Sequence, residues 1–284
     1  MDTVKFVKMQ GCGNDYVYID CFQNDISKFD IQDLAVKISD RHFGVGGDGL
    51  VLIAPSDIAD AKMRMFNADG SEGNMCGNAI RCVGKYVFEN GYVNKETIEV
   101  ETKSGIKTLS LNVKDNEVKS VKVKMGKAEF ACEKIPVLYG TEKEVINKPL
   151  VVNGKEYNIT CVSMGNPHCV IYMDETDSLD IEKIGPSFEN NAVFTERVNT
   201  EFISVIDSNT LKMRVWERGS GETLACGTGA CAAVAASVRN GFCKKNEPVT
   251  VILRGGKLSI TYTDDNVIME GAAKIVFKGE FIYD

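Results

Sequence analysis

The chain contains an internal repeat, and this feature constrains its fold more than any other. The segment KMRMFNADGSEGNMCGNAIRCVGKYVFENGY (residues 62–92) aligns without gaps with KMRVWERGSGETLACGTGACAAVAASVRNGF (residues 212–242), at an offset of 212 − 62 = 150 residues. Eight of the 31 aligned pairs are identical, where about two would match by chance at ordinary residue frequencies. A Gly-Asn pair also recurs at nearly the same distance, as Gly13-Asn14 and Gly165-Asn166. A unit of this length exceeds any solenoid period, so the sequence predicts a duplicated domain.

Each repeat shows the same order of local patterns. A short alternating strand, Met63–Phe66 or Met213–Trp216, is followed by a loop containing Gly and Glu, and a helix then begins at a cysteine. Asn90-Gly91 and Asn240-Gly241 are typical helix ends, because the left-handed conformation after a helix favours Gly and Asn. The second helix, residues 226–241, is small and apolar on nearly all sides, so we expect protein to surround it.

Most of the remaining chain has the apolar patterns of strands. One other helix, with apolar spacing and a charged face, is predicted over about Ile31–Arg41. The other predicted strands are Val4–Met9, Tyr16–Asp20, Leu50–Ala54, Thr97–Thr102, Lys107–Val113, Glu117–Met125, Val249–Leu253, Lys257–Thr263 and Lys274–Tyr283.

These patterns predict an α+β protein made of two homologous domains that arose by internal duplication. Each domain is expected to be a curved mixed or antiparallel sheet wrapped around a central helix led by cysteine, with the two domains related by a pseudo-twofold axis. The N-terminal half is expected to span residues 1–126, completed by a C-terminal strand from about 272–284, and the C-terminal half residues 127–271. This join rests on the repeat offset, because no linker rich in Pro, Gly or Ser marks it.

Composition argues against several classes of protein. The net charge of −7 and the lack of a basic block argue against a nucleic-acid partner. No stretch approaches the roughly 20 apolar residues of a membrane span, and the first residues, MDTVKFVKMQ, lack the apolar core of a signal peptide. The sequence therefore predicts a cytoplasmic protein that does not bind membranes.

The ten cysteines are not expected to form disulfides, because a reducing cytosol keeps thiols reduced. A metal site is also not expected: the sequence has no C-x2-C pair and only two histidines, His42 and His168. The segment Gly44–Gly49 matches G-x-G-x-x-G, but it follows a predicted helix and precedes a strand, the reverse of a dinucleotide-binding unit. We interpret it as a turn that shapes a loop.

The two helix starts, Cys76-Gly77-Asn78 and Cys226-Gly227-Thr228, are the strongest functional signal. A thiol at a helix N-terminus lies where the helix dipole and the first N–H groups favour its thiolate, and the following N–H groups can hold a carboxylate. Inverting a carbon that bears one hydrogen requires proton removal on one face and proton return on the other. Two opposed thiols can do both, and charge stabilisation at the α-carboxylate in a site closed to water would replace a cofactor.

These residues carry a resemblance to the diaminopimelate epimerase family that extends over essentially the whole chain. The matching motifs occur in the family's order, although residues 137–155 carry none. They are KMQGCGNDY (8–16), GVGGDGL (44–50), FNADGSEGNMCGNAIRC (66–82), GNPH (165–168), ERVN (196–199) and WERGSGETLACGTGA (216–230).

The resemblance implies a cofactor-independent two-base epimerisation of LL-diaminopimelate to meso-diaminopimelate, with Cys76 and Cys226 as the acid–base pair. It also implies a small-molecule substrate, no metal, and a homodimer, although no subunit interface can be recognised in the sequence. His168 and Glu217 resemble positions that tune the cysteines. The implied substrate-binding residues are Asn14, Asn67, Gly77, Asn78, Asn166, Asn199, Glu217, Arg218, Gly227 and Thr228.

Two alternatives remain at the level of sequence. A related two-thiol racemase could act on proline, hydroxyproline or other amino acids, but Arg218, Glu217 and several asparagines suit a substrate with a second ammonium–carboxylate end. A thiol-redox or zinc-binding module is the alternative from another class, and the absence of C-x-x-C argues against it.

Overall fold

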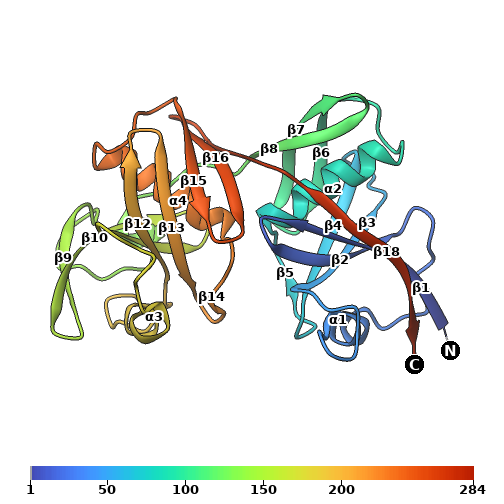
Figure 1. Ribbon diagram of the computed structural model, residues 1–284, viewed down its shortest axis with the longest axis horizontal. Helices are drawn as coiled ribbons and strands as arrows, with labels where there is room; N and C mark the ends of the chain where they lie inside the picture. The colour runs from blue at the N-terminus through green and yellow to red at the C-terminus, as the bar shows by residue number, and fades with distance from the viewer. Residues whose placement is uncertain (1) are drawn as a thin grey trace. The chain divides into compact units, whose positions relative to one another are not determined.

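The computed structural model describes residues 2–284 and divides the chain into two compact units. The N-terminal unit comprises the residues up to Val123 together with Glu270–Asp284, and the C-terminal unit comprises Lys124–Met269. The N-terminal unit is therefore closed by the last strand of the chain, which in Figure 1 is the red β18 lying beside the dark-blue β1.

The N-terminal unit is a mixed sheet with two helices. From β1, which pairs with both β18 and β2, the sheet continues through β3, β4 and β6 to β7 and β8. The β2–β3 and β4–β6 pairs are parallel and the others are antiparallel. Its elements are β1 (Asp2–Gly11), β2 (Asn14–Asp20), α1 (Ile31–Ser39), β3 (Gly49–Ala54), β4 (Ala61–Asn67), β5 (Glu72–Gly73), α2 (Gly77–Glu89), β6 (Thr97–Thr102), β7 (Gly105–Lys114), β8 (Glu117–Lys124) and β18 (Lys274–Tyr283).

The C-terminal unit repeats this plan. Strands β10, β11, β12, β13, β15 and β16 pair in that order, again with two parallel pairs, β11–β12 and β13–β15. Its elements are η1 (Cys132–Lys134), β9 (Lys148–Val152), β10 (Lys155–Ser163), β11 (Pro167–Tyr172), α3 (Ile181–Glu189), β12 (Asn199–Asp207), β13 (Thr210–Glu217), β14 (Gly221–Glu222), α4 (Gly227–Arg239), β15 (Pro248–Leu253) and β16 (Gly256–Tyr262). Strand β17 (Val267–Gly271) begins in this unit and ends in the N-terminal one.

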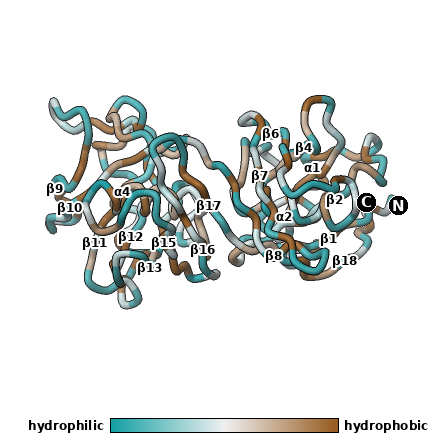
Figure 2. The backbone as a smooth tube through the Cα atoms, turned by 90° about the horizontal axis from the view of Figure 1, so that it is seen from above, coloured by the Kyte–Doolittle hydropathy of each residue, from teal (hydrophilic) through white to brown (hydrophobic). Residues whose placement is uncertain are grey.

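Helices α2 and α4 are the central helices of their units. In α2 the residues from Gly77 to Val87 are all buried, and α4 is buried from Gly229 to Ser237. Strands β10 to β13 lie around α4, as Figure 2 shows. The Ala-rich sequence of α4 explains this position, because small side chains allow strands to approach a helix from several directions.

Both central helices end in the way that the sequence predicts. Asn90 and Asn240 are the C-caps, and the following Gly91 and Gly241 have φ of 75° and 79°. Glycine adopts this left-handed conformation without the steric cost that a Cβ would add.

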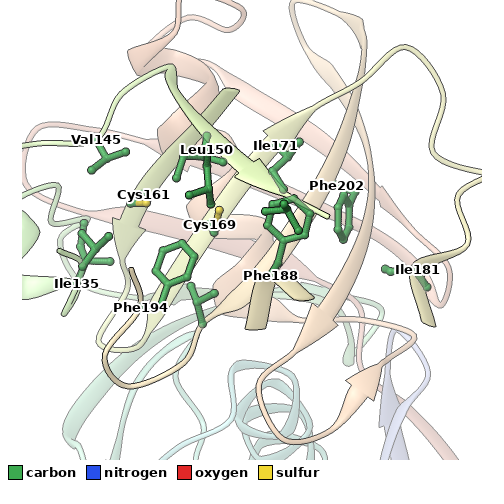
Figure 3. Packing of buried hydrophobic residues seen from close by; sticks show 14 residues of the cluster. Ile135, Val145, Leu150, Cys161, Cys169, Ile171, Ile181, Phe188, Phe194 and Phe202 are labelled. Atoms are coloured by element: carbon green, nitrogen blue, oxygen red, sulfur yellow. The ribbon is translucent and has the colours of Figure 1, made fainter. Parts of the chain in front are cut away.

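The rest of the C-terminal core lies on the side of the sheet that faces α3. Phe188 of α3 packs edge-on against Phe202 of β12, with ring centroids 5.6 Å apart. Figure 3 shows these rings beside Cys161 and Cys169. The two cysteines are fully buried and free, so they are apolar packing residues.

The predicted fold class is confirmed for each unit: a mixed sheet wrapped around a central helix led by cysteine. The predicted helices and strands all form, with ends that differ by up to three residues. Sequence analysis missed β9 to β12, α3 and β17, and the two-residue strands β5 and β14. In β10, β11 and β12 five or six consecutive residues are buried, so these strands lack the alternation that marks a half-exposed strand.

Candidate active site

Cys76 is the N-cap of α2 and has an extended backbone, with φ −126° and ψ 122°. The short segment after β5 leads to this residue, and the N–H of Ala79 donates to the Cys76 Sγ at 3.5 Å. The thiol therefore occupies the position that Ser or Asp takes in an ordinary N-cap. This geometry is the one that the Cys-Gly-Asn pattern predicts.

Cys226 is the N-cap of α4 in the same way, with φ −115° and ψ 112°. The N–H of Gly229 donates to the Cys226 Sγ at 3.3 Å, and the Thr228 hydroxyl lies 3.5 Å from the same sulfur. Cys226 is 5% exposed, whereas Cys76 is partly exposed. The two helix starts thus share a backbone geometry but differ in burial.

Burial raises the pKa of the Cys226 thiol well above its ordinary value, and the Glu217 and Glu201 carboxylates raise it further. The Thr228 hydroxyl and the Gly229 N–H act in the opposite direction. Position at a helix start was expected to favour the thiolate, but in Cys226 desolvation outweighs it, because a low-dielectric surrounding disfavours a charge.

Glu217 at the end of β13 lies beside Cys226. Burial raises the pKa of its carboxyl, while hydrogen bonds from the Thr223 hydroxyl and from Cys226 lower it. A carboxyl with a raised pKa next to a thiol is a candidate for proton exchange with that thiol.

In the N-terminal unit, Cys76 is linked to a surface carboxylate through Asn14. The Cys76 thiol donates to the Asn14 Oδ1 at 3.3 Å, and the Asn14 Nδ2 donates to Asp48 at 2.6 Å. Asp48 also accepts from the Asp15 N–H at 3.1 Å and from Arg41 at 2.9 Å. The predicted residue Asn14 therefore contacts the predicted cysteine.

The loop Gly44–Gly49 presents Asp48 to Asn14. A Cβ on Gly47 would lie 2.7 Å from the Lys8 Nζ and 3.0 Å from the Asp15 carbonyl oxygen, and Gly46 has φ 80°. These positions require glycine because the loop packs its backbone against β1 and β2. The loop lies between α1 and β3, as the sequence predicts.

A chain of buried and partly buried polar groups leads to Cys226 in the C-terminal unit. The His168 Nδ1 lies 2.7 Å from the Glu201 Oε1, and its Nε2 lies 3.0 Å from the Asn166 Oδ1. The Asn166 Nδ2 donates to the Thr228 Oγ1 at 3.3 Å. His168 and Glu201 are both 0% exposed. This brings three predicted residues together with Glu201.

Asn199 and Arg218 form a second cluster in this unit. The buried Asn199 donates through Nδ2 to the Pro167 carbonyl at 2.9 Å and accepts the Arg218 N–H at 2.9 Å. The Arg218 guanidinium donates to the Glu196 carbonyl at 2.8 Å. Asn199 thus joins β11 to the turn that carries Arg218.

The remaining predicted residues lie at the helix starts or on a loop. Gly77, Asn78 and Gly227 are buried in the first turns of α2 and α4. Such first-turn N–H groups lack acceptors within their own helix, which makes them suited to an anion. Asn67 is exposed at the end of β4, and its Nδ2 donates to the Ser71 hydroxyl at 2.9 Å.

Sequence analysis missed Asp48 and Glu201. Asp48 lies in the glycine motif that was interpreted as a shaping turn, and an acidic residue inside such a motif is a signal that could have been followed. Glu201 lies in the buried strand β12, where only its charge within an apolar run, TEFISV, marks it. A buried carboxylate needs a partner, and His168 is the nearest candidate in the parallel strand β11.

Among residues 2–284 there is no group of three or more His, Cys, Asp or Glu side chains arranged to hold a metal ion. In the same residues, no helix is both long enough and apolar enough to cross a membrane.

The chain matches a known protein family over most of its length. The model of the family described as diaminopimelate epimerase matches residues 6–131 and 160–276. The chain is 55% identical over 280 residues to a diaminopimelate epimerase of Acetivibrio thermocellus, covering 98% of each chain. It is 51% identical over 286 residues to a diaminopimelate epimerase of Methanococcus maripaludis, covering 98% of this chain and 99% of the other.

Solved structures share the fold at low sequence identity. A Bacillus anthracis phenazine biosynthesis protein of the PhzF family superposes with a TM-score of 0.73 at 18% identity, covering all of both chains. A hydroxyproline epimerase from Agrobacterium vitis, with bound trans-4-hydroxy-L-proline, gives a TM-score of 0.67 at 12% identity, covering 98% of this chain and 92% of the other. At these identities the likeness concerns the fold alone.

Proposed function

The chain belongs to the diaminopimelate epimerase family, and from this premise we propose that it inverts one α-carbon of LL-diaminopimelate to give the meso isomer, with Cys76 and Cys226 as the two proton-transferring groups. One thiolate removes the α-proton, and the other thiol returns a proton to the opposite face. The two cysteines exchange roles when the reaction runs in reverse. The enzyme is an isomerase that acts on a small molecule.

One observation carries the proposal: two cysteines occupy the same N-cap position of the central helix in two units built on one plan. A cysteine that serves only for packing has no reason to recur at a helix start. At a helix N-terminus, by contrast, the dipole and the free N–H groups stabilise the charge that develops during proton transfer.

We assign the α-carboxylate of the substrate to the first-turn N–H groups of the two helices. Gly77 and Asn78 in α2, and Gly227 and Thr228 in α4, would hold the carboxylate where negative charge develops as the α-proton leaves. This stabilisation acts on the carbanion-like transition state more than on the ground state, which is the requirement for catalysis. The chemistry is proposed to need no cofactor.

The distal ammonium and carboxylate of the substrate are assigned to the polar residues around these helix starts. Arg218 would hold the distal carboxylate, because a guanidinium can bind it with two parallel hydrogen bonds. Glu217 would accept from the ammonium, and His168 and Glu217 would tune Cys226, which Glu217 contacts. The amide side chains assigned to substrate binding are Asn14, Asn67, Asn166 and Asn199.

We further propose that the enzyme works in the cytoplasm as a homodimer. Within residues 2–284 none of the ten cysteines forms a disulfide, which fits a reducing compartment. Light scattering of the purified protein tests the dimer, and a monomer at micromolar concentration would contradict it.

Incubation with LL-diaminopimelate, followed by chiral chromatography, tests the activity. We expect a mixture of the LL and meso isomers and no inversion of proline, hydroxyproline or lysine in parallel reactions. Faster inversion of proline than of diaminopimelate would favour the related racemases instead.

The same reaction in deuterated water tests the proton transfer. Each inverted α-carbon should carry one solvent deuteron, because the returning proton comes from a thiol that has equilibrated with solvent. Inversion without deuterium would exclude transfer through exchangeable thiols.

A further inference from the structure

A buried carboxylate that the proposed mechanism does not use, Glu189, lies at the end of α3. Glu189 is 6% exposed. Its Oε2 accepts from the Trp216 indole N–H at 2.7 Å. Its Oε1 accepts from the Gly219 N–H at 2.9 Å and from the Arg197 guanidinium at 2.9 Å. These donors replace the hydration that the carboxylate loses on burial.

Helix α3 packs against β13 and β14 and presents one face to Trp216 (Figure 1). Gly185 and Glu189 are four residues apart, so they lie on the same side of the helix. A Cβ on Gly185 would lie 2.3 Å from the Cδ2 of the Trp216 indole, so the close approach of the ring requires glycine. The indole N–H then meets Glu189 one helical turn further along. This packing fixes the end of β13 against α3.

The turn that follows β13 carries Arg218 and is held by two buried side chains. The Arg218 N–H donates to the Asn199 Oδ1 at 2.9 Å, and the next N–H, that of Gly219, donates to Glu189. Gly219 has φ 77°, a left-handed conformation that glycine adopts without steric cost. Because two successive N–H groups have buried acceptors, the direction in which the Arg218 side chain leaves the backbone is fixed.

The Arg218 guanidinium contacts a segment that is also tied to Glu189. Its Nη1 donates to the Glu196 carbonyl oxygen at 2.8 Å. The next residue, Arg197, directs its own guanidinium to Glu189. Glu189 therefore connects the turn that carries Arg218 with the segment that holds the end of its side chain. A guanidinium has five N–H donors, so the contact with Glu196 leaves it others with which to bind a carboxylate.

The equivalent helix of the N-terminal unit has no carboxylate at this position. Helices α1 and α3 begin 181 − 31 = 150 residues apart, which is the offset of the internal repeat. Ser39 therefore corresponds to Glu189, and Phe66 corresponds to Trp216. A serine and a phenylalanine cannot form the contact between a carboxylate and an indole N–H.

The turn after β4 is closed by its own side chains instead. The Asp69 carboxylate accepts from the Ser71 N–H at 2.9 Å and from the Ser71 hydroxyl at 2.6 Å. The backbone plan that the two units share thus forms this turn without a carboxylate from the helix. This comparison indicates that Glu189 serves a need of the turn that carries Arg218.

We propose that Glu189 is a positioning residue that places Arg218 for the distal carboxylate of the substrate. The proposal rests on the proposed function, which assigns Arg218 to that carboxylate, and deepens it. A guanidinium binds a carboxylate through two parallel hydrogen bonds, and this geometry tolerates little displacement. Because Glu189 acts through Arg218, its replacement should weaken substrate binding and leave proton transfer at the cysteines intact.

Steady-state inversion of LL-diaminopimelate by Glu189→Gln tests the proposal. An amide has only one oxygen, so it cannot accept both from the Trp216 indole and from the donors at Oε1. We expect KM to rise by about tenfold and kcat to stay nearly unchanged, because the interaction that is lost holds the substrate equally before and during proton transfer. A fall in kcat with an unchanged KM would overturn the proposal.

Combination with Arg218→Ala shows whether Glu189 acts through Arg218. The double variant Glu189→Gln/Arg218→Ala should have the same KM as Arg218→Ala alone, because the positioned group is already gone. A further rise of KM in the double variant would show that Glu189 acts in another way, and would overturn the proposal.

NMR signals of the unliganded protein test the placement of the turn without any activity. Trp216 is the only tryptophan in the chain, so its indole N–H gives one signal. In Glu189→Gln this signal and that of the Gly219 N–H should both shift, because a charged acceptor is lost. If neither signal shifts, the proposal is wrong. An inactive wild-type enzyme whose signals respond in this way would contradict the proposed function but leave Glu189 as the residue that places the turn.

Glu182→Gln is the matched control, because Glu182 is an exposed glutamate on the same helix. It should leave KM and both NMR signals unchanged. Equal effects in the two variants would attribute the result to the charge of α3 and would overturn the proposal.

Arg197→Met supplies a second variant if Glu189→Gln does not fold, because the Arg197 side chain is 55% exposed. It removes the link between Glu189 and the segment that holds the Arg218 guanidinium. KM should rise by about threefold at unchanged kcat, a smaller effect that suits a partly exposed ion pair. An unchanged KM would contradict the proposal.

Discussion

The N-terminal unit carries Tyr16 and Val51 at the positions where the C-terminal unit carries His168 and Glu201. The strand registers establish the equivalence: Val17 pairs with Leu50 as Cys169 pairs with Thr200. Tyr16 and His168 each precede one member of these pairs, so they correspond. Val51 and Glu201 each follow the other member, so they also correspond. The duplicated backbone is the same, but a tyrosine and an apolar residue in one unit correspond to a buried ionisable pair in the other.

This difference shows which properties of the site a duplication preserves. The helix start, the capping cysteine and the asparagine recur, because they depend on backbone geometry that both units share. The groups behind the asparagine differ: the loop Gly44–Gly49 supplies Asp48 in one unit, and the strand β12 supplies Glu201 in the other.

The largest expected effect concerns the feature that the units share. Replacement of Cys76 or Cys226 by Ala should each lower kcat/KM for inversion by at least about a thousandfold, or about 4 kcal/mol, because in the proposed mechanism each removes one of the two proton carriers. Cys→Ser should also be severely slow, since a hydroxyl is a far weaker base. Chiral chromatography measures the loss. Cys231→Ala, in the same helix as Cys226, is the control and should keep its activity.

The next prediction tests whether the N-terminal unit can hold the ionisable pair of the C-terminal unit at the equivalent positions. Val51→Glu buries a carboxylate at a position that is 0% exposed, without an imidazole beside it, and should cost about 3–5 kcal/mol of unfolding free energy. The double variant Tyr16→His/Val51→Glu should recover part of this loss, because it recreates the pair found in the C-terminal unit. Urea unfolding measures both. A double variant no more stable than the sum of the single changes would contradict the equivalence.

A smaller effect is expected at the first turn of α4. Gly229 corresponds to Ala79, and a Cβ on Gly229 would lie 2.7 Å from the Glu201 Oε1 and 3.2 Å from the Cys226 Sγ. Gly229→Ala should therefore destabilise the protein by about 1–3 kcal/mol and slow inversion. The reciprocal Ala79→Gly should cost only about 0.5–1 kcal/mol, as glycine does in any helix. Equal losses in thermal unfolding would argue against crowding by Glu201.

The smallest effect concerns the pH dependence of stability. Burial raises the pKa of Glu217 above its unfolded value, so its contribution to stability is present below the unfolded pKa and is lost as the pH rises through the folded pKa. Glu217→Gln stays neutral and should escape this loss. The difference in Tm between the variant and the wild type should grow in favour of the variant from pH 4 to pH 8. A difference that shrinks over this range would contradict the raised pKa.

The sequence by itself determined the features that depend on local backbone. The 150-residue offset and the Cys-Gly starts predicted two units with central helices, and the Asn-Gly ends predicted where those helices stop. These inferences hold because helix caps are set by a few neighbouring residues. The buried strands β10 to β12 escaped prediction because a strand covered on both faces loses its alternation.

Only the tertiary structure decided the chemical surroundings of each thiol. Asp48 reaches Asn14 from 34 residues away, and Glu201 reaches His168 from 33 residues away across a parallel strand pair. Neither pairing leaves a local pattern, because strand register brings together residues that no spacing in the sequence relates. The raised pKa of Cys226 likewise follows from burial, which depends on all the elements packed around α4 and not on the residues that cap it.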